Sequence, residues 1–282
     1  MIYLDHYTTA ASFLAETETY LCQRELENNM ILGFSKAFAA EEVLQESVLW
    51  TNVCENGQIQ ATAMLQGTKL MIATNENQAE AINTLAHFYA KNQLDVVTVI
   101  AEKACSELFE NHYPETPTER IGLLLHQLIT VNPLHIAAGQ WEYADMAEID
   151  LLADWLIAFQ TDIHDAHTST KEEAVLYMKK KVAEKAICKW LVAGEMVSIA
   201  GIVRKTPHIA MVGLVYTSPN MRGKGYATSI VQALSEKMLQ QGFVYCGLFT
   251  EMENAVSNYI YQKIGYVAGA EFRELVYGSR RF

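Results

Sequence analysis

The second half of the chain alternates between hydrophobic spacing typical of strands and spacing typical of helices. Apolar, β-branched-rich runs at 196–204 and 208–217 flank a Lys-Thr-Pro segment, a pattern that predicts an antiparallel hairpin. A turn-rich stretch follows at 218–225, and apolar residues then recur at helical spacing until Gly242, a good C-terminal stop for a helix. This segment therefore predicts two strands, a loop and a helix.

Further elements of both kinds are expected on either side of this segment. They are helices at 145–160 and 171–185 around the polar loop 161–170, strands at 187–192, 243–250 and 271–277, and a helix at 254–264 followed by Gly265. Because strands and helices alternate along the chain, the predicted fold class is α/β, of the α+β type with a mixed sheet.

The first half repeats this order. Its pattern predicts strands at 58–65 and 69–74, a helix at 78–91, a strand at 94–101 and a helix at 102–112. An internal duplication explains the match with 196–264, and a chance resemblance between ordinary α/β segments is the alternative. Prolines punctuate the junction, and we place the boundary near 132–135. The predicted domains are 1–134, closed by a strand at 118–131, and 135–282.

Composition limits the classes of function. The chain has 282 residues, of which 50% are hydrophobic and 19% are charged, so it is expected to fold around a full core. Its net charge of −12 argues against nucleic acid as the main ligand and against an anionic membrane surface. No apolar run reaches membrane-spanning length, and the first residues lack a cationic segment followed by an apolar one. A cytoplasmic protein without nucleic-acid or membrane partners is the expectation.

The five cysteines are scattered, odd in number and form no Cys-x-x-Cys pair. Reduced thiols that pack as small hydrophobic residues are favoured over a disulfide or a zinc site.

Charge is divided unequally between the halves: residues 1–135 hold 6 basic and 17 acidic side chains, whereas 136–282 hold 15 and 16. The nearly neutral second half can accept a polyanionic ligand, and the acidic first half favours a cationic molecule or solubility.

The loop before the helix at 226 carries the candidate chemistry. It reads Arg222-Gly223-Lys224-Gly225-Tyr226-Ala227. Two glycines allow the backbone N–H groups to approach an oxyanion, and the helix that follows directs its positive dipole end there. A pyrophosphate fits such a loop, although an ordinary surface turn explains it as well. The spacing matches neither a P-loop nor the dinucleotide fingerprint G-x-G-x-x-G, since Thr228 stands at the third glycine position.

Two motifs in this half resemble the GNAT superfamily of acetyl-CoA-dependent N-acetyltransferases. The first is the loop, which fits Arg/Gln-x-x-Gly-x-Gly/Ala and follows the bend 215–219. The second is Asn254 with Tyr261 seven residues later and then Lys-Ile-Gly-Tyr. The resemblance covers about 136–282 and is only topological over 1–135. It implies tandem GNAT-like domains, each with a central, mostly antiparallel sheet flanked by helices, and a splayed strand pair in the C-terminal domain.

The resemblance also implies roles for individual residues. The backbone of Arg222, Gly223, Lys224, Gly225, Tyr226 and Ala227 would hold the pyrophosphate of acetyl-CoA, a co-substrate, and no metal is implied. The backbone of Val215, Tyr216 and Thr217 would pair with the pantetheine amides. Asn254 would contact the pantetheine arm, although a plain helix cap is as good an explanation. Tyr261 would protonate the departing thiolate, the alternative being a packed core tyrosine.

The implied reaction is direct transfer of the acetyl group to a primary amine of a small molecule or peptide, and a cationic amine is one option for the acceptor. A general base is not evident, because relatives often carry a carboxylate on the strand before the loop and 208–217 contains none. His208, Glu251, a water chain and the loop residues Asp162, His164, Asp165 and His167 stay open as candidates. A metal site on that His-x-x-His spacing is the less favoured interpretation.

The first half has Asn75-Glu76-Asn77-Gln78 in the place of the phosphate loop, with no glycine and no basic residue. It is therefore expected not to bind coenzyme A. It would complete the acceptor pocket or shield a sheet edge, or act only as a packing partner. For the whole chain, an acyltransferase is the leading hypothesis. The alternative is a non-catalytic acyl-CoA sensor with the same fold.

Overall fold

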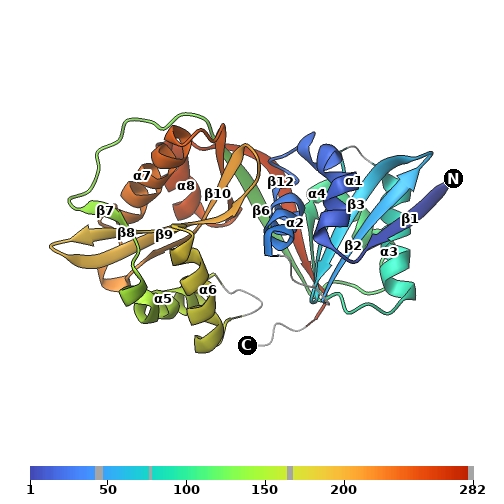
Figure 1. Ribbon diagram of the computed structural model, residues 1–282, viewed down its shortest axis with the longest axis horizontal. Coiled ribbons are helices and arrows are strands. Elements are labelled where there is room, and N and C mark those ends of the chain that lie inside the picture. Colours follow the sequence, from blue (N-terminus) through green and yellow to red (C-terminus); the bar gives the residue numbers. More distant parts are fainter. Residues whose placement is uncertain (42–46, 76–77, 164–167, 279–282) are drawn as a thin grey trace. The chain divides into compact units, whose positions relative to one another are not determined.

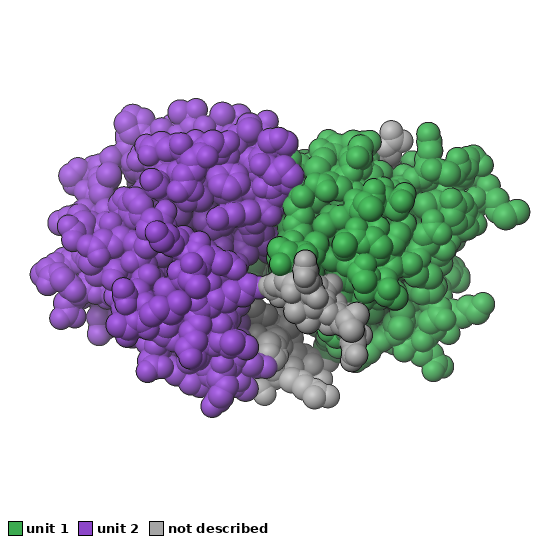
Figure 2. Space-filling model, in the orientation of Figure 1, with its two compact units in different colours: residues 1–125, 250–254, 269–279 green, residues 126–249, 255–268, 280–282 purple. Residues whose placement is uncertain are grey.

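The computed structural model describes residues 1–41, 47–75, 78–163 and 168–278 (Figure 1). The chain forms two compact units, each assembled from separate segments (Figure 2). Unit 1 comprises 1–125, 250–254 and 269–279, and unit 2 comprises 126–249, 255–268 and 280–282. The predicted boundary at 134/135 would divide the chain only once, whereas both units here include separate segments from near the C-terminus. The predicted boundary therefore remains a prediction.

The same order of ten elements occurs twice along the described residues. The first set is β1 (Ile2–Tyr7), α1 (Ala10–Cys22), α2 (Asn29–Glu41), β2 (Val48–Glu55), β3 (Gln58–Gln66), β4 (Lys69–Ala73), α3 (Ala79–Lys91), β5 (Thr98–Glu102), α4 (Lys103–His112) and β6 (Glu119–Leu128). The second set is β7 (Gln140–Tyr143), α5 (Ile149–Asp162), α6 (Lys171–Ala183), β8 (Ile187–Val192), β9 (Glu195–Lys205), β10 (Ile209–Thr217), α7 (Tyr226–Gln240), β11 (Tyr245–Glu251), α8 (Ala255–Ile264) and β12 (Val267–Val276). The tandem organisation expected from the sequence is confirmed.

In unit 1 the strands lie in the order β1-β2-β3-β4-β5-β12. Neighbours are antiparallel, apart from β4 and β5, which run parallel. The last strand of the chain, β12, pairs with β5 from Phe272 opposite Glu102 to Val276 opposite Thr98. The sequence pattern predicts this strand as part of the C-terminal domain, but its alternation of residues does not specify which strand it pairs with.

In unit 2 the strands follow the order β11-β10-β9-β8-β7. Here β10 and β11 are the parallel pair, and β7 to β10 are antiparallel to their neighbours. Both units thus have the mixed, mostly antiparallel sheet that was expected.

Each sheet carries helices on both faces, because its strands alternate buried side chains toward two separate cores. In unit 1, Leu70 and Val99 belong to the core that includes α3 and α4, while Trp50 and Met71 belong to the core that includes α1 and α2. In unit 2, residues of α7 and α8 pack on one core and residues of α5 and α6 on another. The strand ends and the loops that follow them are consequently the parts free to bind ligands.

The helices of the described ranges pack against the sheets through one buried face. None of them combines the length and the hydrophobicity needed to cross a bilayer. The five cysteines all have free thiols, and all except Cys22 are buried. These side chains therefore pack as small apolar residues.

Candidate active site

The parallel strands of unit 2 separate part-way along their length. Residues Ile209–Met211 of β10 pair with Tyr245–Gly247 of β11. Both strands then continue, β10 as far as Thr217 and β11 as far as Glu251. Beyond Met211, the described residues of β10 have no partner on β11. The predicted splay is present, and the freed backbone groups of β10 need a hydrogen-bonding partner such as the amides of a ligand arm.

A bulge lies in β10 at the start of the splay. Gly213 is opposite Gly201 of β9, whereas Tyr216 is already opposite Ile199, so β10 contains one extra residue. Leu214 takes up the irregularity with a φ of 50°, unusual for a residue with a branched side chain. A side chain at Gly213 would meet Cγ1 of Val203 at 2.8 Å. Tight packing therefore holds the bulge, and the bulge redirects the peptide groups of β10.

The last residues of β10 are fixed on the side of β9. Ser198 Oγ donates a hydrogen bond to the carbonyl of Tyr216 at 3.0 Å and lies 2.8 Å from Thr217 Oγ1. Tyr216 is buried, while Val215 and Thr217 are half-buried. Residues 215–217, which are expected to bind a pantetheine arm, are therefore fixed on the side of β10 that faces β9. Their other side lies beyond the residues of β10 that pair with β11.

The loop between β10 and α7 has the conformation that its two glycines predict. Gly223 and Gly225 have φ values of 77° and 84°. Gly225 is the N-cap of α7, with no side-chain hydrogen bond to the first turn. Gly223, Lys224 and Gly225 are exposed, and the position of a Cβ at Gly223 meets no atom within 4 Å. The N-terminus of a 15-residue helix is thus left uncapped by side chains beside an open backbone turn, which suits an anion.

The two basic side chains of the loop differ in their contacts. Lys224 is exposed, and its Nζ lies 3.4 Å from the sulfur of Met221. Arg222 instead donates from Nε to the carbonyl of Thr217 at 3.0 Å and from a terminal nitrogen to Asp162 at 2.5 Å. Both positive charges belong to the predicted pyrophosphate loop, but only that of Lys224 lies without an acidic partner among the described residues.

Tyr261, the expected general acid, lies half-buried on α8. Its ring packs edge-on against Tyr266, with centroids 5.8 Å apart. Tyr266 shares a hydrogen bond of 2.8 Å with Ser235, whereas no described residue hydrogen-bonds the hydroxyl of Tyr261. Burial raises the pKa of Tyr261 to about 12. With no hydrogen-bonding partner among the described residues, this hydroxyl is available to water or to a ligand.

A histidine not selected from the sequence lies next to this tyrosine. His126 on β6 is fully buried, and its ring centroid is 6.3 Å from that of Tyr261. Burial lowers the pKa of His126, and a hydrogen bond with Asn258 opposes this effect. His126 is therefore neutral near pH 7 and adds no charge beside the phenol. Its only sequence signal is a histidine within an apolar strand, a pattern more typical of a core residue.

The remaining sequence candidates lie on several different elements. Asn254 is exposed, directly precedes α8, and donates its backbone N–H to the carbonyl of Glu251 at 3.1 Å; both residues belong to unit 1. His208 precedes β10 at the paired end, separated from the splay by 209–211. Asp162 is bonded to Arg222. His164, Asp165 and His167 lie outside the described residues. No group suited to a metal ion occurs within the described ranges.

Unit 1 has a matching parallel pair with different surroundings. Lys69–Met71 of β4 pair with Thr98–Ile100 of β5, and the strands then part. At the divergence, Arg24 donates to both carboxylate oxygens of Glu102, at 2.7 and 2.9 Å, and to the carbonyl of Thr74 at 3.2 Å. The backbone N–H of Asn75 is donated to the hydroxyl of Tyr20. The backbone that follows β4 is thus already bonded within unit 1.

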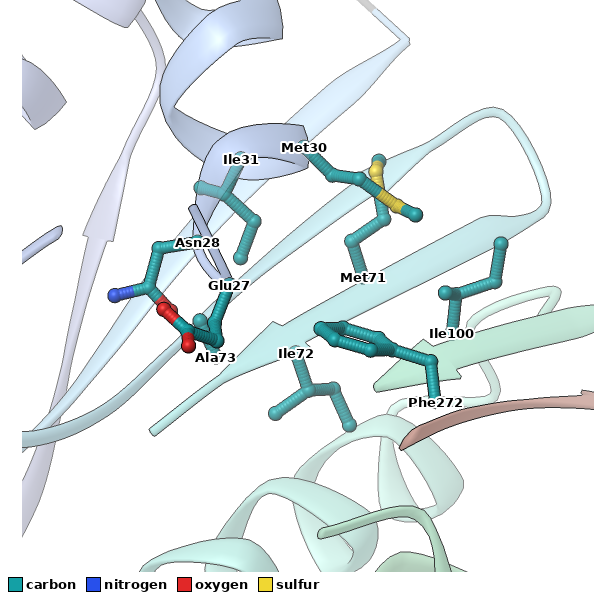
Figure 3. Close-up of a pocket in the computed structure, with 9 residues that line it drawn as sticks. All are labelled: Glu27, Asn28, Met30, Ile31, Met71, Ile72, Ala73, Ile100 and Phe272. Atoms are coloured by element: carbon teal, nitrogen blue, oxygen red, sulfur yellow. The ribbon is translucent and has the colours of Figure 1, made fainter. Parts of the chain in front are cut away.

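A shallow, mostly apolar pocket lies beside this closed splay (Figure 3). Its empty volume of about 200 Å³ includes open solvent. The side chains around it are Glu27, Asn28, Met30, Ile31, Met71, Ile72, Ala73, Ile100 and Phe272. Asn28 donates its amide hydrogens to Leu21 and Asn75, and Glu27 lies 3.7 Å from Arg24. These lining residues include no basic side chain and no glycine turn for a phosphate.

The family model for acetyltransferases of the GNAT family matches residues 149–266, a segment that includes the splayed β10, the glycine loop and Tyr261. This segment is a GNAT acetyltransferase domain. The match confirms the family resemblance seen in the two motifs, and it ends before β12. No curated protein sequence matches the chain.

Solved structures share the GNAT fold over nearly the whole chain. A GNAT-family acetyltransferase from Colwellia psychrerythraea is 11% identical with a TM-score of 0.63, and the match covers 98% of this chain and 100% of that one. A Drosophila protein is 11% identical with a TM-score of 0.67, and the match covers 98% and 99%. A tandem GNAT protein from the clavulanic acid biosynthesis pathway is 10% identical with a TM-score of 0.59, and the match covers 99% of both chains. At these identities the likeness establishes the tandem fold.

Proposed function

We propose that the GNAT domain transfers the acetyl group of acetyl-CoA to a primary amine of a small molecule or peptide. The observation that carries this proposal is the junction of three features in unit 2: the splay of β10, the open turn at Gly223 and the uncapped N-terminus of α7. The extended pantetheine arm of a coenzyme can pair with the free edge of β10, while the coenzyme's pyrophosphate accepts hydrogen bonds from the backbone N–H groups of the turn and the helix.

Acetyl-CoA would supply the acetyl group as an activated thioester. The bulge around Leu214 presents backbone N–H groups of β10 at the start of the splay, where they can polarise a carbonyl oxygen. Tyr261 would donate its proton, or a strong hydrogen bond, to the sulfur as the C–S bond breaks. With a pKa of about 12, its phenol stays protonated throughout the neutral range. Since a thiol has a pKa of about 8.5, hydrogen bonding to the thiolate is favoured over complete proton transfer.

The acceptor amine must lose a proton before attack, because an alkylamine has a pKa of about 10.4. Residues 208–217 contain no carboxylate to receive that proton. Water is the simplest acceptor of the proton in this arrangement. The net negative charge of the first half favours a cationic amine, since residues 1–135 hold 17 acidic against only 6 basic side chains.

A non-catalytic acyl-CoA sensor is the second candidate, favoured by the missing carboxylate on β10. The free hydroxyl of Tyr261 favours the enzyme. Calorimetric titration with acetyl-CoA tests both, because absence of binding would rule out both functions. If binding occurs, a thiol-release assay with polyamines, aminoglycosides, amino acids and peptides separates them. Release with one acceptor class supports the enzyme, and none with any class supports the sensor.

A further inference from the structure

Arg222 does not direct its side chain at the turn that it precedes. Its guanidinium is engaged by the Thr217 carbonyl, by the carboxylate of Asp162 at 2.5 Å and by the face of Tyr216, with 5.6 Å from Cζ to the ring centroid. All of these groups belong to unit 2. The positive charge of Arg222 is thus neutralised in the protein without coenzyme.

Asp162 contributes nothing favourable to its own helix. It is the last residue of α5, and no basic side chain lies in the last turn. A carboxylate at this end of a helix interacts unfavourably with the negative end of the helix dipole. Its favourable contact in the structure is therefore the one with Arg222.

The contact is also of a kind that an anion can displace. Both side chains are about half exposed, at 49% and 48%, and a single carboxylate oxygen makes the bond. Exposed pairs of this type contribute little to stability, because water and salt screen both charges. In unit 1, by contrast, Arg24 holds both oxygens of Glu102, and the side chains are 32% and 25% exposed. The unit 2 pair is the weaker one, and it borders the open turn.

We propose that Asp162 sets the coenzyme affinity of the GNAT domain by competing with the coenzyme phosphates for Arg222. In the free protein the carboxylate holds the guanidinium. Phosphate groups, which carry more charge and bind arginine through two oxygens, take its place on binding. This inference rests on the proposed function, since it requires that the loop binds a phosphorylated coenzyme.

Calorimetric titration of coenzyme A into the full chain tests the competition. Asp162→Asn removes the competing charge and is expected to tighten binding about twofold to fivefold at low salt, with a smaller gain at high salt because exposed charges are screened. Asp154→Asn is the matched control: Asp154 is on the same helix and pairs with Lys171 instead, at 2.5 Å. Its binding is expected to equal that of the unaltered chain.

The route through Arg222 is tested by combining substitutions. In an Arg222→Gln background, Asp162→Asn should no longer improve binding. Equal or weaker coenzyme binding by Asp162→Asn alone would overturn the proposal. A gain in affinity that persists in the Arg222→Gln background would also overturn it, because the gain would then come from the change in net charge and not from Arg222. If the unaltered chain itself binds no coenzyme A, the proposed function fails rather than the competition. Thermal unfolding of each variant verifies that it is folded.

Discussion

The two units share one order of elements but differ at the point where their parallel strands part. In unit 2 the end of β10 leads to a glycine turn and an uncapped helix. In unit 1 the end of β4 is held by Arg24 and Tyr20. The splay itself is common to both, so strand geometry alone does not distinguish the proposed coenzyme site of unit 2 from its counterpart in unit 1. The difference lies in whether the backbone groups at the splay are still available.

The same contrast applies to charge. Unit 1 uses a guanidinium to close its splay with a carboxylate from β5, while unit 2 keeps an exposed pair beside the turn and an additional Lys224. We expect unit 1 not to bind coenzyme A, for the reason that its strand ends are satisfied internally. Four experiments test this contrast, and their expected effects decrease from the first to the last.

The largest effect is expected from Tyr261→Phe, which removes the proposed acid without changing the packing of the ring. The turnover rate should fall about 10²-fold, the lower end of general acid catalysis, because the raised pKa makes hydrogen bonding the main contribution. Steady-state kinetics and coenzyme titration measure the two effects. Coenzyme affinity should be unchanged, and Tyr259→Phe, an exposed position on the same helix, should have no effect. An unaltered rate would exclude Tyr261 as the acid.

Arg24→Ala in unit 1 should destabilise the protein by about 1–2 kcal/mol, because it leaves the half-buried carboxylate of Glu102 without its bidentate partner. Arg222→Ala in unit 2 should cost only about 0–1 kcal/mol, since its ion pair is exposed. Chemical denaturation of both variants gives the comparison. Equal losses would contradict the view that one splay is locked and the other is open.

Gly223→Ala should weaken coenzyme binding about tenfold, since a side chain at a φ of 77° strains the turn that presents the N–H groups. Gly194→Ala is a matched control, with a φ of 84°, open surroundings and a position in the turn between β8 and β9. Titration with coenzyme A should separate the two variants even if both lose similar stability. Similar affinities would show that the turn does not hold the ligand.

The smallest effect concerns pH. Burial holds the pKa of His126 below that of an unfolded histidine, about 6.5. As the pH falls below this value, the unfolded chain takes up the proton first, so the stability from neutral His126 is lost toward acid. Thermal midpoints between pH 7 and 5 should fall less steeply in His126→Gln. His87→Gln, at an exposed position of unit 1, should keep the original slope.

The GNAT domain is largely predictable from sequence because its signals are local. The hairpin of β9 and β10, the turn at Gly223 and Gly225, and the two helices α7 and α8 follow from spacing and glycine positions within short windows. The splay is implied by the family resemblance. A glycine adopts a positive φ because it lacks a side chain, and this depends on few neighbouring residues. The sequence therefore predicts such turns well.

Features that depend on distant partners cannot be predicted in the same way. From the sequence, no element is predicted within 1–57, where β1, α1, α2 and β2 lie, and none at Gln140–Tyr143, which form β7. The bonds from Arg24 to Glu102 and from Arg222 to Asp162 join positions 78 and 60 residues apart. Neither residue type nor spacing indicates such pairs, because the folded backbone decides which charges meet.

The pairing of β12 with β5 has a consequence for biosynthesis. Unit 1 begins at the first residue, yet residues 269–279 complete its sheet. While the ribosome is still making unit 2, the nascent unit 1 exposes the edge of β5, and an open edge is prone to pair with other chains. Unit 1 therefore finishes folding late, although it is made first. A fragment covering only 1–134 should aggregate or be digested rapidly by proteases. Adding the peptide 267–278 should slow the digestion and reduce the aggregation.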